Sequence, residues 1–224
     1  MTTYRLERLA RLPAAERGLT IGDFLVPIAI GERLGVRIYH LGLVALGALV
    51  IALSALISIP LPGTPVPITG QTFGVLVVAT SLGYRRGIAS TLLYIAVGVI
   101  GIPTFAESRA GLGVIASLSD GRLVLGATGG YLVGFLLAGG VVGRLAELGW
   151  DRHLGRSIVA MLAGSVAIYA VAIPWLAASA SYTTGEAIAK GLLPFVVGDL
   201  LKVALAAGIF PVAWWLVGRR PHER

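Results

Sequence analysis

The most constraining feature of this chain is its last long apolar stretch, Leu192 to Trp215, which contains only two charged residues. About 20 apolar residues suffice for a helix to cross a bilayer. Asp199 and Lys202 are three residues apart, so a helix places both on one face, one turn from each other. A charge at mid-bilayer costs roughly 2.5 to 3.5 kcal/mol, so these side chains should face a partner, a cavity or a ligand. They form either a structural ion pair between helices or part of a polar pocket for a small solute, open toward one membrane face.

The rest of the chain has the same apolar character. Hydrophobic residues make up 56% of it, charged residues only 13%, and the mean hydropathy is +0.87. These values indicate an integral membrane protein. We predict an all-α fold with six transmembrane helices, at 38–59, 68–83, 87–102, 123–142, 157–176 and 192–217. Cysteine is absent, which excludes disulfides and thiolate metal sites.

The basic residues indicate the topology. Of the 18 Lys and Arg residues, only Arg109, Arg122 and Lys190 fall on the predicted outer side, Lys202 lies within a segment, and the other fourteen fall on the inner side. The positive-inside rule therefore places both termini in the cytoplasm, and topology rather than nucleic-acid binding explains the net charge of +7.

The chain divides into three parts under this topology. We expect a cytoplasmic, partly amphipathic or disordered N-terminal extension at 1–37, in which Leu6, Leu9 and Leu12 recur among arginines. A six-helix membrane domain follows at 38–218, and a short basic cytoplasmic tail at 219–224.

A proline-rich loop follows the first predicted helix. Four prolines between residues 59 and 68 forbid helix and hold their neighbours extended. The next two apolar segments are short for complete crossings. One explanation is a re-entrant loop that dips below the headgroups and forms a lid over the outer pocket. Such a loop would shorten the distance that helix 2 must cross. Non-helical backbone at that depth must be surrounded by protein or water. An ordinary rigid outer loop is the alternative.

Two further features have open interpretations. Arg109, in the predicted outer loop 103–125, is a candidate clamp for an anion because its planar fork matches a carboxylate; pairing with Glu107 is the alternative. Ala48 and Ala52 give the first helix a flat face suited to another helix, either of a partner protein or of the same chain.

The sequence lacks the usual signs of an enzyme. It has no Gly-x-x-x-x-Gly-Lys-Ser/Thr loop for nucleotide phosphates. The three histidines are not clustered with carboxylates, which argues against an intramembrane metalloenzyme.

Together these residues resemble the BioY family, the biotin-specific S component of energy-coupling factor (ECF) transporters, from about Ala45 to Ala207. The matching stretches, in family order, are Ile59-Pro60-Leu61-Pro62, Thr64-Pro65-Val66-Pro67-Ile68-Thr69-x-Gln71-Thr72, Gly83-x-Arg85-Arg86-Gly87, Leu93-Tyr94, Gly98, Gly101-x-Pro103, Thr128-Gly129-Gly130-Tyr131, Pro174-Trp175-Leu176-Ala177 and Pro194-Phe195-x-x-Gly198-Asp199-Leu200-Leu201-Lys202. The stretch Val114 to Leu125 and the polar N-terminal region are longer than is usual in that family.

The resemblance implies a function. It implies high-affinity capture of biotin at the outer face of a prokaryotic plasma membrane, without a cofactor, and delivery through a partner module of one transmembrane coupling subunit and two ATPases. Asp199 would accept from the ureido N–H groups, Lys202 or Arg109 would hold the carboxylate, and further hydrogen bonds would come from Thr69, Gln71, Tyr94 and Tyr131. Ala48 and Ala52 would meet the coupling subunit. One alternative is a self-sufficient biotin carrier that works without the ATPases, alone or as an oligomer. Another is an intramembrane enzyme.

Overall fold

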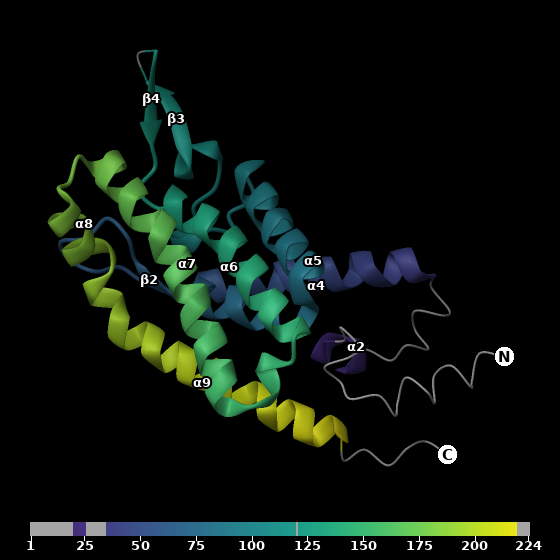
Figure 1. The fold of residues 1–224 in the computed structure, drawn as a ribbon. Helices are drawn as coiled ribbons and strands as arrows, with labels where there is room; N and C mark the ends of the chain where they lie inside the picture. The colour runs from purple at the N-terminus through teal and green to yellow at the C-terminus, as the bar shows by residue number, and fades with distance from the viewer. Residues whose placement is uncertain (1–19, 26–34, 120, 219–224) are drawn as a thin grey trace.

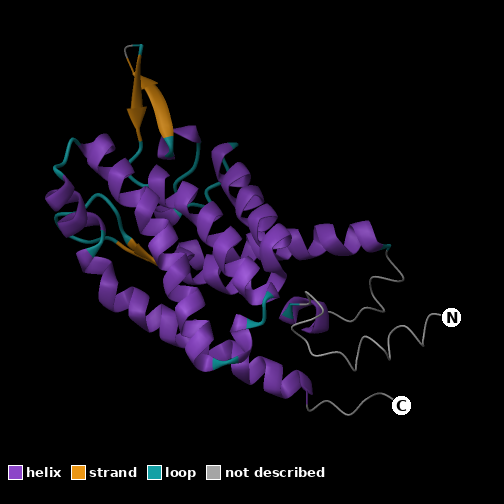
Figure 2. Cartoon of the chain, in the orientation of Figure 1, coloured by secondary structure: helices purple, strands orange, loops and turns teal. Residues whose placement is uncertain are grey.

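A computed structural model describes residues 20–25, 35–119 and 121–218 of the chain. The fold is mostly helical, with long helices packed against one another, one hairpin that protrudes from them and a second, very short strand pair that lies beside the helices (Figures 1 and 2). The helices are α2 (Ile21–Leu25), α4 (Val36–Leu56), α5 (Gln71–Val99), α6 (Gly129–Glu147), α7 (Leu154–Ala180), α8 (Thr184–Gly191) and α9 (Val196–Gly218). The strands are β1 (Ser58–Ile59), β2 (Ile68–Thr69), β3 (Ala116–Ser119) and β4 (Arg122–Leu125).

Helix α5 reverses its direction at Gly83. That residue has φ 80° and ψ −175°, a conformation that glycine adopts without steric cost. Gln71 and Tyr94 are hydrogen-bonded to each other, although 23 residues of straight helix would separate them by about 35 Å. A Cβ on Gly87 would lie only 3.0 Å from the Cα of Ala79. The segments predicted at 68–83 and 87–102 are therefore the two halves of α5, which fold back on each other at Gly83.

Four helical stretches of the described chain are long and apolar enough to cross a membrane. They are Arg37–Leu56, Gly129–Glu147, Leu154–Ala180 and Thr184–Leu216. Many of the large apolar side chains on α4 and α9 point outward, with exposed fractions above 50% for Leu41, Leu53, Leu201 and Leu205. Such a surface fits a multi-pass membrane protein, where lipid covers what water would not.

The mostly helical structure agrees with the predicted all-α class, but two short strand pairs were not predicted. β1 pairs with β2, in the register Ser58↔Thr69, and β3 pairs with β4, in the register Ser117↔Val124. The helix predicted to start at residue 123 begins only at Gly129. Residues 122–125 instead form the second strand of a hairpin that protrudes from the bundle (Figure 1), because a turn through Gly121, with φ 70°, returns the chain along β3.

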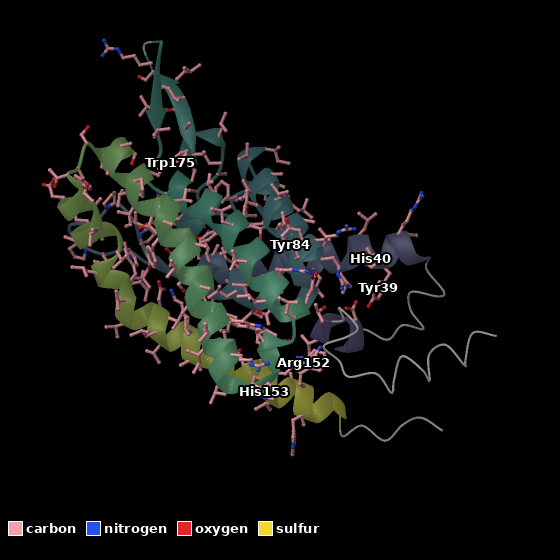
Figure 3. All side chains as sticks on the ribbon, viewed as in Figure 1. Tyr39, His40, Tyr84, Arg152, His153 and Trp175 are labelled. Carbon is pink, nitrogen blue, oxygen red and sulfur yellow. The ribbon has the colours of Figure 1, made fainter. Side chains whose placement is uncertain are left out.

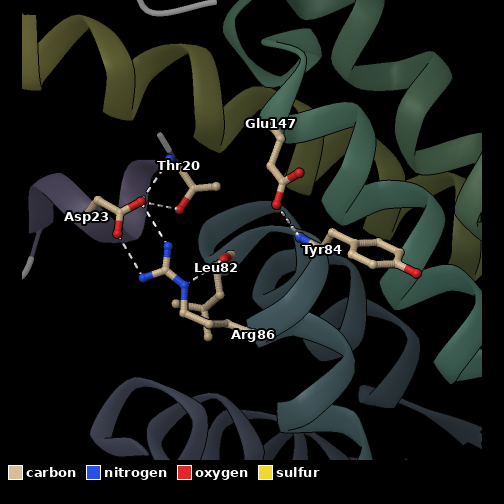
Figure 4. Close-up of polar contacts among 6 residues, drawn as sticks. All are labelled: Thr20, Asp23, Leu82, Tyr84, Arg86 and Glu147. Atoms are coloured by element: carbon tan, nitrogen blue, oxygen red, sulfur yellow. Dashed lines mark hydrogen bonds and ion pairs between the residues drawn. The ribbon is translucent and has the colours of Figure 1, made fainter. Parts of the chain in front are cut away.

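Helix α2 docks at the end of the bundle away from the β3–β4 hairpin (Figure 1), against the reversal of α5 (Figure 4). Both oxygens of Asp23 accept from the Arg86 guanidinium, at 2.7 and 2.9 Å. Thr20 donates to Asp23 through its backbone N–H and its hydroxyl. Ile21, 1% exposed, packs with residues of α5, α6, α7 and α9. Burial raises the pKa of Asp23, but the hydrogen bonds from Arg86 and Thr20 and the Arg86 charge hold it below its ordinary value.

This docked helix belongs to the predicted N-terminal extension. Part of that extension is therefore packed against the membrane domain. The amphipathic repeat with Leu6, Leu9 and Leu12, and the tail at 219–224, lie outside the described residues.

The small-residue face of α4 packs within the chain. Ala48 is 7% exposed and belongs to a buried cluster formed with α5, α6 and α7. Ala52 is partly buried and packs against the same cluster. A Cβ on Gly47 would lie 2.9 Å from Val78, so the two helices approach closely there. In the described chain this flat face packs against the chain's own helices, and its contact with a partner subunit stays a prediction.

Candidate ligand-binding site

A cavity of about 580 Å³ of empty space, including its mouth, lies at the end of the bundle that carries the proline-rich loop. Trp175 lies at the hairpin end of α7 and donates to the Gly126 carbonyl at 2.9 Å, whereas Arg152 and His153 lie at the other end of α7 (Figure 3). The lining residues are Val66, Pro67, Thr69, Gln71, Thr72, Phe105, Ala106, Arg109, Val114, Thr128, Tyr131, Leu132, Phe135, Tyr169, Phe195, Asp199 and Lys202.

Asp199 and Lys202 form an ion pair in this cavity. The Lys202 Nζ donates to Asp199 Oδ1 at 2.9 Å, and the side chains are 17% and 10% exposed, respectively. Asp199 lies in the first turn of α9, where the helix dipole favours a negative charge. The Tyr169 hydroxyl, from α7, donates to Asp199 Oδ2. Each carboxylate oxygen thus has one protein donor and keeps acceptor capacity for a ligand.

Aromatic rings form the wall beside this pair. Tyr131 lies edge-to-face with Tyr169, with ring centroids 6.2 Å apart, and its ring is 6.5 Å from that of Phe195. The Tyr131 hydroxyl donates to the Gly191 carbonyl at the end of α8. Tyr131 therefore lines the cavity mainly with its ring, because its hydroxyl already has a partner in the protein.

Gln71 and Thr69 form a second polar group on the cavity wall. The Thr69 hydroxyl donates to Gln71 Oε1 at 3.2 Å, and Gln71 Nε2 donates to the Tyr94 hydroxyl. Gln71 is 6% exposed and opens α5, while Tyr94 is 1% exposed and is not among the lining residues. Tyr94 therefore lies behind Gln71 and orients its amide.

The proline-rich loop covers the cavity beside these residues. Val66 and Pro67 line it, and Val66 is only 5% exposed because it packs against Leu176 and Phe195. The loop leads directly into β2 and then into Gln71, the first residue of α5. The segment that covers the cavity is therefore continuous with the polar wall at Thr69 and Gln71.

Arg109 lies at the mouth. It lines the deep cavity and also a neighbouring, more open cavity of about 530 Å³ of empty space. It forms an ion pair with Glu107, the partner considered from the sequence. Val114 and Thr128 line both cavities as well, so the two meet along this side.

Six of the seven predicted binding residues line one cavity, and Tyr94 supports it from behind. Sequence reasoning missed Tyr169, which is 30 residues from its partner Asp199 and on another helix. It also missed the apolar wall of Phe105, Phe135 and Phe195. Phe195 was within reach, because it belongs to the same motif as Asp199, but nothing in the sequence pairs Tyr169 with that aspartate. The described residues contain no group of three or more His, Asp or Glu side chains suited to a metal ion.

Comparison with known proteins identifies the family. The BioY family profile matches residues 29–219, which is most of the chain. The chain belongs to the BioY family. This confirms the resemblance seen in the sequence. Helix α2 lies before the range that the family profile matches.

Individual relatives agree with this assignment. The chain is 34% identical over 167 residues to the biotin transporter BioY of Rhizobium etli, covering 71% of this chain and 84% of the relative. It is 35% identical over 157 residues to the biotin transporter BioY of Thermotoga maritima, covering 70% and 85%. These relatives are transporters, which agrees with the expectation that this BioY-family protein is not an enzyme.

A solved structure has the same fold. It is the crystal structure of the S component for biotin from an ECF-type ABC transporter, with a TM-score of 0.69 and 24% identity, covering 84% of this chain and 95% of that one. At this identity the likeness establishes the fold of this BioY-family protein as that of a membrane S component.

Proposed function

We propose that this protein captures biotin at the outer face of the membrane and delivers it inward as the substrate-specific subunit of an ECF transporter. One observation carries the proposal: Asp199, Lys202, Gln71 and Thr69 meet in one partly enclosed, aromatic-lined cavity in a member of the BioY family. Biotin has two ureido N–H donors, a ureido acceptor, an apolar ring system and a carboxylate. The cavity offers a partner for each.

The charges suggest how biotin lies. Lys202 is already neutralised by Asp199 at 2.9 Å, whereas Arg109 is at the mouth and reaches both cavities. We therefore place the ureido ring deep, with its N–H groups on Asp199 and its oxygen near the Gln71 amide. The carboxylate at the end of the acyl tail then points outward to Arg109. In this pose the rings of Tyr131 and Phe195 contact the bicyclic rings.

The topology has six crossings in this proposal, with the halves of α5 counted as two. Both termini are cytoplasmic, and the loop between β1 and β2 is re-entrant, because it covers a cavity rather than lipid. Single cysteines at Ser108 and His153, both exposed, test this arrangement with an impermeant thiol reagent. We expect labelling from outside at Ser108 and from inside at His153. The reverse pattern would place the cavity on the wrong face and overturn the proposal.

The proposed partners are one transmembrane coupling subunit and two ATPase subunits in a prokaryotic plasma membrane. A BioY protein that works alone is the alternative, and uptake separates the two. Cells that express this chain with a coupling module should accumulate labelled biotin, and cells that express the chain alone should not. Sustained ATP-independent uptake by the chain alone would favour the self-sufficient carrier.

Binding by the purified protein tests the substrate itself. Isothermal titration in detergent should give a dissociation constant for biotin far below those for thiamine and riboflavin. Thiamine is cationic and riboflavin is larger and uncharged, so neither offers a ureido ring together with a carboxylate. Equal or tighter binding of either vitamin would refute biotin as the substrate.

A further inference from the structure

The two residues of the ion pair at the cavity mouth, Arg109 and Glu107, lie in different environments. Arg109 lines the ligand cavity, whereas Glu107 lines neither the deep nor the open cavity. The Arg109 Nη2 donates to Glu107 Oε2, and the side chains are 40% and 35% exposed. Glu107 therefore holds the arginine from outside the space that a ligand would occupy.

The backbone keeps these two residues together. Glu107 and Ser108 have φ angles of 58° and 56°. Residues other than glycine rarely adopt this left-handed backbone conformation. The turn is closed by two backbone hydrogen bonds, from Phe105 N to the Arg109 carbonyl at 3.1 Å and from Arg109 N to the Ala106 carbonyl at 3.2 Å. The Phe105 side chain, 1% exposed, anchors the turn against Gly98. Strained conformations of this kind persist where surrounding contacts hold them.

The cavity offers no cation without a carboxylate partner among its described lining residues. Lys202 is paired with Asp199, and Arg109 is paired with Glu107. A ligand carboxylate that enters the cavity must therefore compete with a carboxylate of the protein for its cation. A ligand without a carboxylate meets no such competition at Arg109.

We propose that Glu107 is an internal competitor for Arg109, which sets the affinity of the cavity for carboxylated ligands and leaves neutral ones unaffected. The proposal rests on the proposed function, because it assumes that the biotin carboxylate binds at Arg109. Glu107 itself is a positioning residue: it occupies the guanidinium in the empty protein and releases or shares it on binding. Its removal makes Arg109 available without altering the ureido end of the cavity.

The test compares biotin with biotinamide, whose tail ends in a neutral amide. Dissociation constants of both ligands are measured by titration for the parent, Glu107→Gln and Glu107→Gly. Glycine tolerates the positive φ, so this variant keeps the turn if glutamine strains it. The control is Glu186→Gln on α8, an exposed carboxylate that lines neither cavity. Glutamine there preserves the capping box with Thr183, so only an outer-face charge is lost.

Both Glu107 variants should bind biotin about two- to fivefold more tightly, the range for an exposed ion pair, and bind biotinamide like the parent. The gain should shrink in high salt, because exposed charges are screened. The Glu186 variant should change neither ligand. An unchanged or weaker affinity for biotin, or an equal shift for both ligands, would make Glu107 a structural part of the turn and overturn the proposal. A parent that binds neither ligand would refute the proposed function instead.

Discussion

Replacing Asp199 and Lys202 separately and together distinguishes a structural ion pair from a ligand site. The proposed variants are Asp199→Asn, Lys202→Met and the double substitution. In each single variant one polar group stays in a largely buried position without its charged partner, although Tyr169 still donates to residue 199. In the double variant no unpaired charge remains. Stability and binding should therefore respond differently to the second substitution.

The magnitudes follow from the contacts. Breaking a buried ion pair by removing one partner costs about 3 to 5 kcal/mol of stability, while removing both is often nearly neutral. With side chains 17% and 10% exposed and a remaining donor at Tyr169, we expect a loss of stability at the lower end of that range for each single variant.

Loss of a hydrogen bond to a charged group costs about 1.5 to 3 kcal/mol of binding free energy. This loss raises the dissociation constant for biotin roughly 10- to 150-fold.

The assay combines thermal unfolding in detergent with biotin titration on the same preparations. Both single variants should unfold at lower temperature and bind biotin weakly. The double variant should recover most of the thermal stability but none of the affinity. If it binds biotin like the parent, the pair is purely structural, and the assignment of Asp199 as the ureido acceptor is refuted.

Three further predictions concern the polar wall of the cavity, the proline-rich loop and helix α2. Gln71→Leu should weaken biotin binding about 5- to 100-fold, because a buried ligand group loses its hydrogen-bond partner. If titration gives the parental affinity, Gln71 does not contact biotin. Alanine at both Pro65 and Pro67 should raise the biotin dissociation rate several-fold while the association rate stays near parental; stopped-flow exchange with an unchanged off-rate would reduce the loop to a connector. Because the folded pKa of Asp23 is lowered, its ion pair with Arg86 stabilises the protein above the unfolded pKa of about 3.9 and is lost as the pH falls through the folded pKa. Asp23→Asn should thus lower the unfolding temperature at pH 7, and this difference should close below about pH 4; a pH-independent difference would contradict the linkage.

Local patterns in the sequence predicted much of the site. The three-residue spacing of Asp199 and Lys202 placed them on one helix face, and the structure pairs them. Prolines interrupt helix wherever they cluster, so the loop before Gln71 and the start of a helix at that residue followed from composition. The prediction of two separate crossings at 68–83 and 87–102 implied a chain reversal between them, and the reversal occurs at Gly83.

Contacts between distant residues were beyond this reasoning. Tyr169 meets Asp199 only because α7 packs beside α9, and no spacing within either helix signals it. Leu123 and Val124 suit a membrane helix and a strand equally well, so the hairpin went unpredicted. Ala48 has the small side chain that close helix packing needs, but the sequence does not show which helix packs against it.

The reversal at Gly83 also bears on how the protein enters its membrane. Under the proposed topology, the halves 71–82 and 84–99 rise only about 18 and 24 Å at 1.5 Å per residue, against a hydrocarbon core of about 30 Å. Neither half is a sufficient insertion signal by itself. They must partition into the bilayer as a preassembled helical hairpin, with Arg85 and Arg86 left at the face from which synthesis proceeds. The turn at Gly83 must therefore form before the two halves insert into the membrane. Gly83→Val should reduce the amount of protein that reaches the membrane, even though the residue is remote from the cavity.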